Sequence, residues 1–324
     1  MSKTIFVTGG HGFVGSWVVR ALLARGYKVR CLVRASSKTH RIDDLEVETV
    51  VGDILDKPSM VAAMQGCEQC IHLAGISAYK DMQESWTIPT IVDGTRNVFE
   101  AAAEAGIGRV VYIGSGIVYC SHDPDRVCDE TSPFVLEESG LFYAIGKHHA
   151  ELEVDAAVER GQDIVVAIPM ETYGPNDDQF LTTGYLKEAI TGWPALATRG
   201  GTSFAHVEDV AEGIVLALEK GSRGERYILG GENASIKEII ELCLDVAGKP
   251  KPVVVLPTGI TKFILRGLDR LGLPTPEHPN AVDYGTLFGY VRIDKARKEL
   301  GYAPRPPREV MESTIAWLRS AGHI

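Results

Sequence analysis

Three residues in the middle of the chain carry functional groups suited to proton transfer beside a carbonyl. Tyr143 and Lys147 are four residues apart, so they lie on the same side of a helix. A phenol, with an ordinary pKa of about 10, is a poor acid or base at pH 7, and a neighbouring ammonium lowers that pKa by favouring the phenolate. Ser115 follows a β-rich run, and its hydroxyl could polarise a substrate carbonyl. The pattern predicts catalysis by Ser115, Tyr143 and Lys147, although a solvated helix face is a common alternative explanation of Y-x-x-x-K.

A glycine-rich segment, T-G-G-H-G-F-V-G at residues 8–15, joins a strand-like run to a helical pattern. It fits G-x-G-x-x-G from Gly10 and G-x-x-G-x-x-G from Gly9. Such glycines let the backbone turn sharply and approach a pyrophosphate, which the free N–H groups and dipole of the helix N-terminus attract. The motif alone is a weak signal. Its position between the first strand and the first helix favours a dinucleotide site.

The residue that distinguishes NAD from NADP binding is expected about 20 positions after the last glycine, at the end of the second strand. An acidic residue there would bind the ribose 2′-OH of NAD. This chain instead has Arg34, followed by Ser36, Ser37 and Lys38. A guanidinium and an ammonium suit a 2′-phosphate better than a bare hydroxyl. We therefore expect NADP(H) rather than NAD(H), with an ordinary surface arginine as the alternative explanation.

Short β-rich runs alternate with helical patterns through the first half of the chain, which favours a doubly wound parallel sheet with its ligand crevice at the carboxyl ends of the strands. After Pro169 the alternation of strands and helices gives way to short segments rich in glycine and proline. We expect a Rossmann-type α/β fold in which residues 1–168, with returns near 206–230, bind NADP(H). Residues 169–324 then form mainly a smaller, discontinuous substrate-binding cap. The expected strands are 4–8, 29–33, 48–51, 69–73, 109–113, 164–168 and 227–229, and the expected helices are 13–25, 58–64, 91–105, 143–159, 207–219, 236–247 and 309–320.

Composition argues against several other classes of protein. The chain has 324 residues, with 33 Lys and Arg against 43 Asp and Glu, giving a formal net charge of −10. An acidic chain without a Lys/Arg-rich stretch is a poor candidate for binding nucleic acid or an anionic membrane. No apolar stretch approaches the roughly 20 residues that span a bilayer. The Cys67–Cys70 pair lacks the second pair or the histidines of a zinc site, so we expect a reduced, cytoplasmic protein without a metal.

Motifs along nearly the whole chain resemble, in family order, the extended short-chain dehydrogenase/reductase family. They are residues 8–15, Gly52-Asp53, H-L-A-G at 72–75, Ser115, Tyr143-x-x-x-Lys147, Tyr173-Gly174-Pro175, F-A-H-V-E-D-V-A at 204–211 and Leu300-Gly301-Tyr302-x-Pro304. The stretch V-R-A-S-S-K at 33–38 is similar to the dihydroflavonol reductase-like branch, which uses NADP(H). Two positions depart from the family pattern. Ile91 stands where members often have Asn, which puts an Asn-dependent water relay in doubt, and Gly146 stands where they often have Ser.

The resemblance implies a role for several residues. Tyr143 would give or take the proton, Ser115 would hold the reacting oxygen, and Lys147 would tune Tyr143 and bind the nicotinamide ribose. Asp53 would accept a hydrogen bond from the adenine amino group, and a homodimer would form through the 91–105 and 143–159 helices. The residues expected to bind the cofactor are Gly9, Gly12, Phe13, Val14, Gly15, Arg34, Lys38, Asp53, Ile54, Leu73, Ala74, Gly75, Tyr143, Lys147 and Pro169.

These observations favour an NAD(P)H-dependent oxidoreductase that reduces a ketone or aldehyde to an alcohol, with Tyr143 as proton donor. The alternatives are a nucleotide-sugar epimerase or dehydratase with tightly bound NAD, a 3β-hydroxysteroid dehydrogenase-like oxidoreductase and a non-catalytic nucleotide sensor. Arg34 argues against the epimerase, and the retained catalytic residues argue against the sensor. We expect His11, His72 and His206 to be structural. The candidate substrate residues are apolar or aromatic, which favours a hydrophobic carbonyl compound; they are Ile76, Ile117, Tyr173 and Phe180.

Overall fold

Seven parallel strands form the central sheet of the computed structural model, which describes residues 3–76, 82, 84–257, 259, 263, 267, 268, 270–272 and 279–324. The strand order is β11-β7-β5-β4-β1-β2-β3. The chain runs outward from β1 to β3 and then returns to place β4 on the other side of β1, so the direction of winding switches between β1 and β4. Doubly wound sheets bind ligands at such a switch point. The strands are β1 (Thr4–Thr8), β2 (Lys28–Val33), β3 (Glu48–Val51), β4 (Gln69–His72), β5 (Arg109–Ile113), β7 (Ile164–Pro169) and β11 (Arg226–Leu229).

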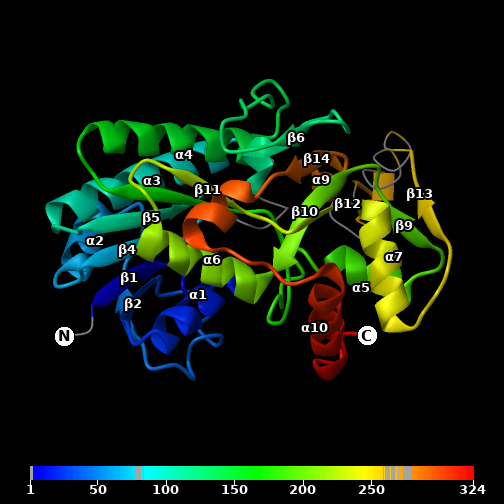
Figure 1. Ribbon diagram of the computed structural model, residues 1–324, viewed down its shortest axis with the longest axis horizontal. Helices are drawn as coiled ribbons and strands as arrows, with labels where there is room; N and C mark the ends of the chain where they lie inside the picture. Colours follow the sequence, from blue (N-terminus) through cyan, green and yellow to red (C-terminus); the bar gives the residue numbers. More distant parts are fainter. Residues whose placement is uncertain are drawn as a thin grey trace.

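Helices cover both faces of this sheet (Figure 1). One face carries α1 (Phe13–Ala24) and α6 (Val207–Lys220), which pack against each other. The other carries α2 (Lys57–Met64), α3 (Thr87–Glu104) and α4 (Phe142–Glu159), with α3 between the other two. Because both faces are covered, the strands can be almost continuously apolar. The sequence expectation of a doubly wound, Rossmann-type α/β fold is confirmed.

Smaller sheets, built mostly by the carboxyl-terminal half, lie beside the main one (Figure 1). One contains β12, β10, β14 and β6, with β8 paired to β10, and a second pairs β9 with β13. A separate apolar cluster joins the three helices α5, α7 and α10 of this half. These elements are β6 (Val127–Cys128), β8 (Glu171–Tyr173), α5 (Gly184–Thr191), β9 (Ala195–Ala197), β10 (Gly201–His206), β12 (Glu232–Ser235), α7 (Ile236–Ala247), β13 (Val253–Val255), α9 (Pro279–Tyr284), β14 (Phe288–Val291) and α10 (Pro307–Ser320), with short helical turns η1 (Gly116–Tyr119) and η2 (Ala296–Leu300).

Local signals explain where several helices begin and end. A capping box of Ser235 and Glu238 opens α7, and Gly248 ends it in the left-handed conformation with φ 67°. The helix expected from residue 91 begins earlier, at Thr87. Pro89 lies in its first turn, where the missing N–H breaks no helical hydrogen bond. The proline therefore lies inside the start of α3 instead of preceding it.

Two expectations drawn from composition concern thiols and membranes. All six cysteines are buried and free, as expected for small core residues. None of the helices in the described part of the chain has the length and apolarity needed to cross a membrane.

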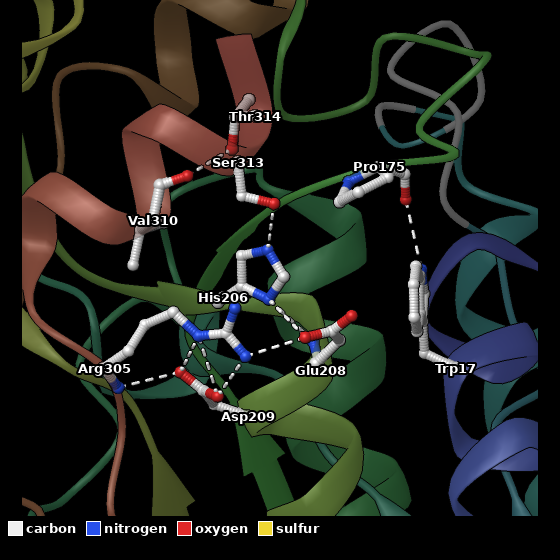
Figure 2. Close-up of polar contacts among 9 residues, drawn as sticks. All are labelled: Trp17, Pro175, His206, Glu208, Asp209, Arg305, Val310, Ser313 and Thr314. Atoms are coloured by element: carbon white, nitrogen blue, oxygen red, sulfur yellow. Dashed lines mark hydrogen bonds and ion pairs between the residues drawn. The ribbon is translucent and has the colours of Figure 1, made fainter. Parts of the chain in front are cut away.

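His206 ties the end of β10 to the carboxyl-terminal helix, as Figure 2 shows. Its side chain is fully buried, and Nδ1 accepts a hydrogen bond from the Glu208 N–H at 3.2 Å. Nε2 therefore carries the proton and donates to the Ser313 hydroxyl at 2.9 Å. Arg305 clamps the same corner by binding the Asp209 carboxylate through Nε and Nη2 and Glu208 through Nη2. This network supports the expected structural role of His206.

We predict that acid weakens the fold partly through His206. Burial, with Arg305 next in importance, lowers its pKa from 6.5 to about 4. Between these two pH values the unfolded histidine binds a proton that the folded one does not, so the free energy of unfolding falls as the pH falls from 6.5 towards 4. One such group contributes a slope of up to about 1.4 kcal/mol per pH unit. Chemical denaturation at pH 7, 6, 5 and 4.5 measures this slope.

His206→Asn should reduce the pH slope, because the titrating ring is gone. The matched control is His122→Asn, since His122 is an exposed histidine. It should keep the slope of the parent. Equal slopes in the parent and in His206→Asn would show that His206 does not carry this acid sensitivity.

Candidate active site

A cleft of about 1530 Å³ lies along the carboxyl ends of the central strands. Thr8, Ile113 and Pro169, the last residues of β1, β5 and β7, all line it. From there it extends to α5 and to the loop before that helix. The crevice predicted at the strand ends is therefore present, and it has room for a dinucleotide together with a second small molecule.

Ser115, Tyr143 and Lys147 converge on the floor of this cleft. Ser115 follows β5, and Tyr143 lies in the first turn of α4, where its hydroxyl approaches the Ser115 Oγ at 3.5 Å. Lys147, one turn further along α4, is buried and donates from Nζ to the Ile113 carbonyl at 2.9 Å. The same ammonium lies 5.1 Å from the centre of the Tyr112 ring. A strand end and a helix start thus bring a hydroxyl, a phenol and an ammonium together.

The pKa of Tyr143 does not shift in the direction expected from the sequence. Burial raises the pKa of Tyr143, and the hydrogen bond with Ser115 opposes that rise only in part. Burial also lowers the pKa of Lys147 to about 8, against the pull of the Glu151 carboxylate. The expected lowering of the Tyr143 pKa by Lys147 is not found, because the ammonium is directed to the Ile113 carbonyl and the Tyr112 ring. At neutral pH the phenol therefore holds its proton, as a proton donor must.

The glycine loop fits a pyrophosphate. Gly9 has φ +73°, and a Cβ on Gly15 would lie 2.1 Å from the Gly9 carbonyl oxygen, so only glycine allows this turn. Gly12 caps α1 without a side-chain hydrogen bond, and the first turn holds no acidic residue. Beside it, His11 Nδ1 is buried without a hydrogen-bond partner among the described residues. Burial, Arg34 and Arg41 all lower the pKa of His11, which shows that positive charge gathers at this helix N-terminus.

Comparison with known proteins identifies the family. Residues 5–230 match the NAD dependent epimerase/dehydratase family. A putative dihydroflavonol 4-reductase of Synechocystis sp. is 32% identical, and the match covers 100% of this chain and 97% of that protein. The chain belongs to this family. It is the family expected from the sequence under the name of extended short-chain dehydrogenases/reductases.

Two further similarities support this family membership. Cinnamoyl-CoA reductase 1 of Oryza sativa subsp. japonica is 34% identical over 74% of this chain and 75% of its own length. The crystal structure of gox2253 matches with a TM-score of 0.83 and 32% identity, covering 100% of both chains. Reductases of the dihydroflavonol reductase-like branch are thus among the relatives of this epimerase/dehydratase family member.

The two positions that depart from the family pattern lie against each other. A Cβ on Gly146 would come within 3.3 Å of the Ile91 Cδ1 and of the Ile88 backbone. Ile91 is almost fully buried and also lines the cleft. An apolar contact between α3 and α4 therefore occupies the position where family members often carry Asn and Ser. A water relay through an amide at position 91 has no basis in this chain.

The residues expected to bind the cofactor all line the cleft. The Leu73-Ala74-Gly75 segment follows β4 and lies against β1, where the Ala74 N–H donates to the Thr8 hydroxyl at 3.1 Å. Arg34 and Lys38 are exposed at the rim, and no described residue forms a hydrogen bond or an ion pair with either side chain. Ser37 holds the turn by accepting a hydrogen bond from the Arg34 N–H at 3.0 Å. Their binding roles remain predictions.

The substrate set needs one correction. Ile76, Ile117 and Phe180 line the cleft, whereas Tyr173 does not. Tyr173 is fully buried in the carboxyl-terminal cluster, and its ring lies 5.6 Å from that of Phe204. The prediction that it contacts substrate is wrong, because β8 pairs with β10 and directs this ring into the core.

Arg41 and Glu171 are two of the charged cleft residues that sequence reasoning missed. Arg41 donates to the Asn176 carbonyl at 2.9 Å and to the His11 carbonyl at 3.5 Å, and it pairs with Asp178 at 3.1 Å. It thereby links the glycine loop to the loop before α5. The second is Glu171, just after β7. Neither stands in a recognisable motif, so only the folded chain shows where they lie.

Proposed function

We propose that this chain is an NADP(H)-dependent carbonyl reductase that converts a ketone or aldehyde to an alcohol. One observation carries the proposal: the cleft brings Ser115, Tyr143 and Lys147 together and also has Arg34 and Lys38 on its rim. The reductase names of the Synechocystis and rice relatives support the direction of the chemistry.

The residues suited to hold the dinucleotide are spread along the cleft. The uncapped N-terminus of α1 would bind its pyrophosphate. Arg34 and Lys38 would bind a 2′-phosphate by charge-assisted hydrogen bonds, and Asp53 would bind the adenine. When bound, the reduced dinucleotide supplies a hydride to the carbonyl carbon.

The chain's own contribution is to move one proton. Ser115 donates a hydrogen bond to the carbonyl oxygen and so stabilises the negative charge that develops there. Tyr143, whose raised pKa keeps the phenol protonated, transfers its proton to that oxygen to complete the alcohol. Lys147, with a pKa of about 8, is mostly charged at pH 7 and stabilises the resulting phenolate. Solvent then returns a proton to Tyr143.

The nucleotide that copurifies with the protein is the first test. Freshly purified protein is denatured, and any released nucleotide is identified by mass spectrometry. A reductase exchanges its cofactor in every turnover, so we expect an empty protein or exchangeable NADP(H). We then expect oxidation of NADPH, followed at 340 nm, with a panel of ketones and aldehydes.

The second candidate is a nucleotide-sugar epimerase or dehydratase, because the matching family is described as NAD dependent epimerase/dehydratase. Such an enzyme returns its hydride to the same substrate and retains its NAD. Near-stoichiometric NAD in the purified protein would therefore overturn the NADP(H) reductase and favour this alternative.

A further inference from the structure

Glu171 is an acidic residue on the substrate side of the cleft. It opens β8, two residues after the end of β7, and its register partner in β10 is Phe204. Arg34 and Asp53, which would bind the adenosine end of the dinucleotide, come from the ends of other strands, β2 and β3. Glu171 instead follows Pro169, the last residue of the strand next to that of Ser115.

The chain around Glu171 is packed directly against the reacting centre. A Cβ on Gly116, the residue after Ser115, would lie 2.5 Å from Met170 Sδ and 3.1 Å from the Pro169 carbonyl oxygen. The 169–171 segment is therefore fixed beside the hydroxyl that would hold the carbonyl oxygen. Cys120 and Ile117 of the same wall also line the cleft, and they are apolar or weakly polar. Glu171 adds a carboxyl group to this wall.

No described residue forms a hydrogen bond or an ion pair with the Glu171 carboxyl group. Its acidic neighbour Asp177 is fully buried and already accepts hydrogen bonds from the backbone N–H groups of residues 181–183. Burial, helped by Asp177, raises the pKa of Glu171 to about 8. At pH 7 the group is thus mostly a neutral acid, which can both donate and accept a hydrogen bond. Leaving such a half-buried group without a partner is costly, and a ligand can remove that cost.

We propose that Glu171 is a specificity residue that hydrogen-bonds a hydroxyl group next to the reacting carbonyl. The substrate class is then a hydroxyketone or hydroxyaldehyde with an apolar remainder. The inference rests on the proposed carbonyl reductase function. It specifies which substituent next to the carbonyl the site would select.

Two probes that differ in one substituent test this assignment. Acetophenone carries a methyl group and 2-hydroxyacetophenone a hydroxymethyl group beside the same aryl ketone. We expect the parent to favour 2-hydroxyacetophenone over acetophenone in kcat/KM, and Glu171→Leu to reduce that preference at least tenfold. A site that pairs a substrate hydroxyl discriminates strongly against the analogue lacking it.

Two variants separate hydrogen bonding from other effects. Glu171→Gln keeps a donor and an acceptor, so it should retain the hydroxyl preference within about threefold. Glu188→Leu removes an exposed carboxylate from the rim of the same cleft and should leave the preference unchanged. If Glu171→Gln lost as much preference as Glu171→Leu, hydrogen bonding by the side chain at position 171 would not explain the preference, and the proposal would fail. Equal preference in the parent and Glu171→Leu would also overturn it.

A binding measurement keeps this inference separate from the proposed function. Calorimetry on protein saturated with NADP⁺ compares 1-phenylethanol with 1-phenylethane-1,2-diol. We expect the diol to bind at least tenfold more tightly in the parent and to lose that advantage in Glu171→Leu. A Glu171-dependent diol preference without any NADPH oxidation would defeat only the reductase. The absence of a diol preference in a protein that reduces ketones would defeat only the role of Glu171.

Discussion

Replacing Tyr143 with phenylalanine should lower kcat for carbonyl reduction by about 10²- to 10⁴-fold, the range for loss of a general acid. The phenol is the group that holds a proton at neutral pH beside Ser115, and phenylalanine retains the ring without it. Among the described residues the hydroxyl makes one long contact, at 3.5 Å, so its removal should change the free energy of unfolding by no more than about 1 kcal/mol. Steady-state kinetics with NADPH and a thermal unfolding curve measure the two effects.

The matched control for this prediction is Tyr27→Phe. Its hydroxyl donates to Glu219 of α6 at 3.1 Å, and neither residue lines the cleft. This variant removes the same atom and should keep kcat within about twofold. Dinucleotide affinity should be preserved in Tyr27→Phe. If Tyr143→Phe reduced a carbonyl as fast as the parent, the assignment of the proton donor would be wrong.

The main sheet could be predicted from the sequence because its signals are local. Each strand is a short apolar run, and each turn that must contain glycine does so, as at residues 9–15. The ends of the expected helices agree with the structure at all but one place, whereas α5 and α9 were not expected. The exception, α3, begins at Thr87 because a proline is compatible with the first turn as well as with the residue before it. Local pattern cannot distinguish those two positions.

The candidate site could be predicted only where residues follow a strand end or share a helix turn. Ser115, Tyr143 and Lys147 satisfy that condition, and the structure brings them together. Tyr173 was misplaced because the pairing of β8 with β10, about 30 residues later in the chain, decides which way its ring points. The pKa of Tyr143 also depends on burial by distant segments, so the spacing to Lys147 predicted its direction wrongly.

Arg34→Glu should reverse the preference between the two dinucleotides. The Arg34 side chain is exposed at the cleft rim without a bonding partner among the described residues, so it is available for a 2′-phosphate. A hydrogen bond to a charged group contributes about 1.5–3 kcal/mol, and 1.4 kcal/mol corresponds to a tenfold change. Because glutamate also repels the phosphate and can accept from a ribose hydroxyl, we expect the NADPH to NADH ratio of kcat/KM to fall by about 10²- to 10³-fold.

Two more variants show whether that reversal is local. Lys38→Ala removes the second rim cation and should reduce the ratio by about tenfold, less than the reversal of charge at Arg34. Arg160→Glu changes the net charge by the same amount as Arg34→Glu at an exposed position outside the cleft, so its ratio should match that of the parent. A fall caused by long-range attraction alone would appear in Arg160→Glu as well and would weaken with added salt. Two results would show that Arg34 does not select the cofactor: a parent enzyme that prefers NADH, or a ratio that is unchanged in Arg34→Glu. Either result would favour the alternative of an enzyme with tightly bound NAD.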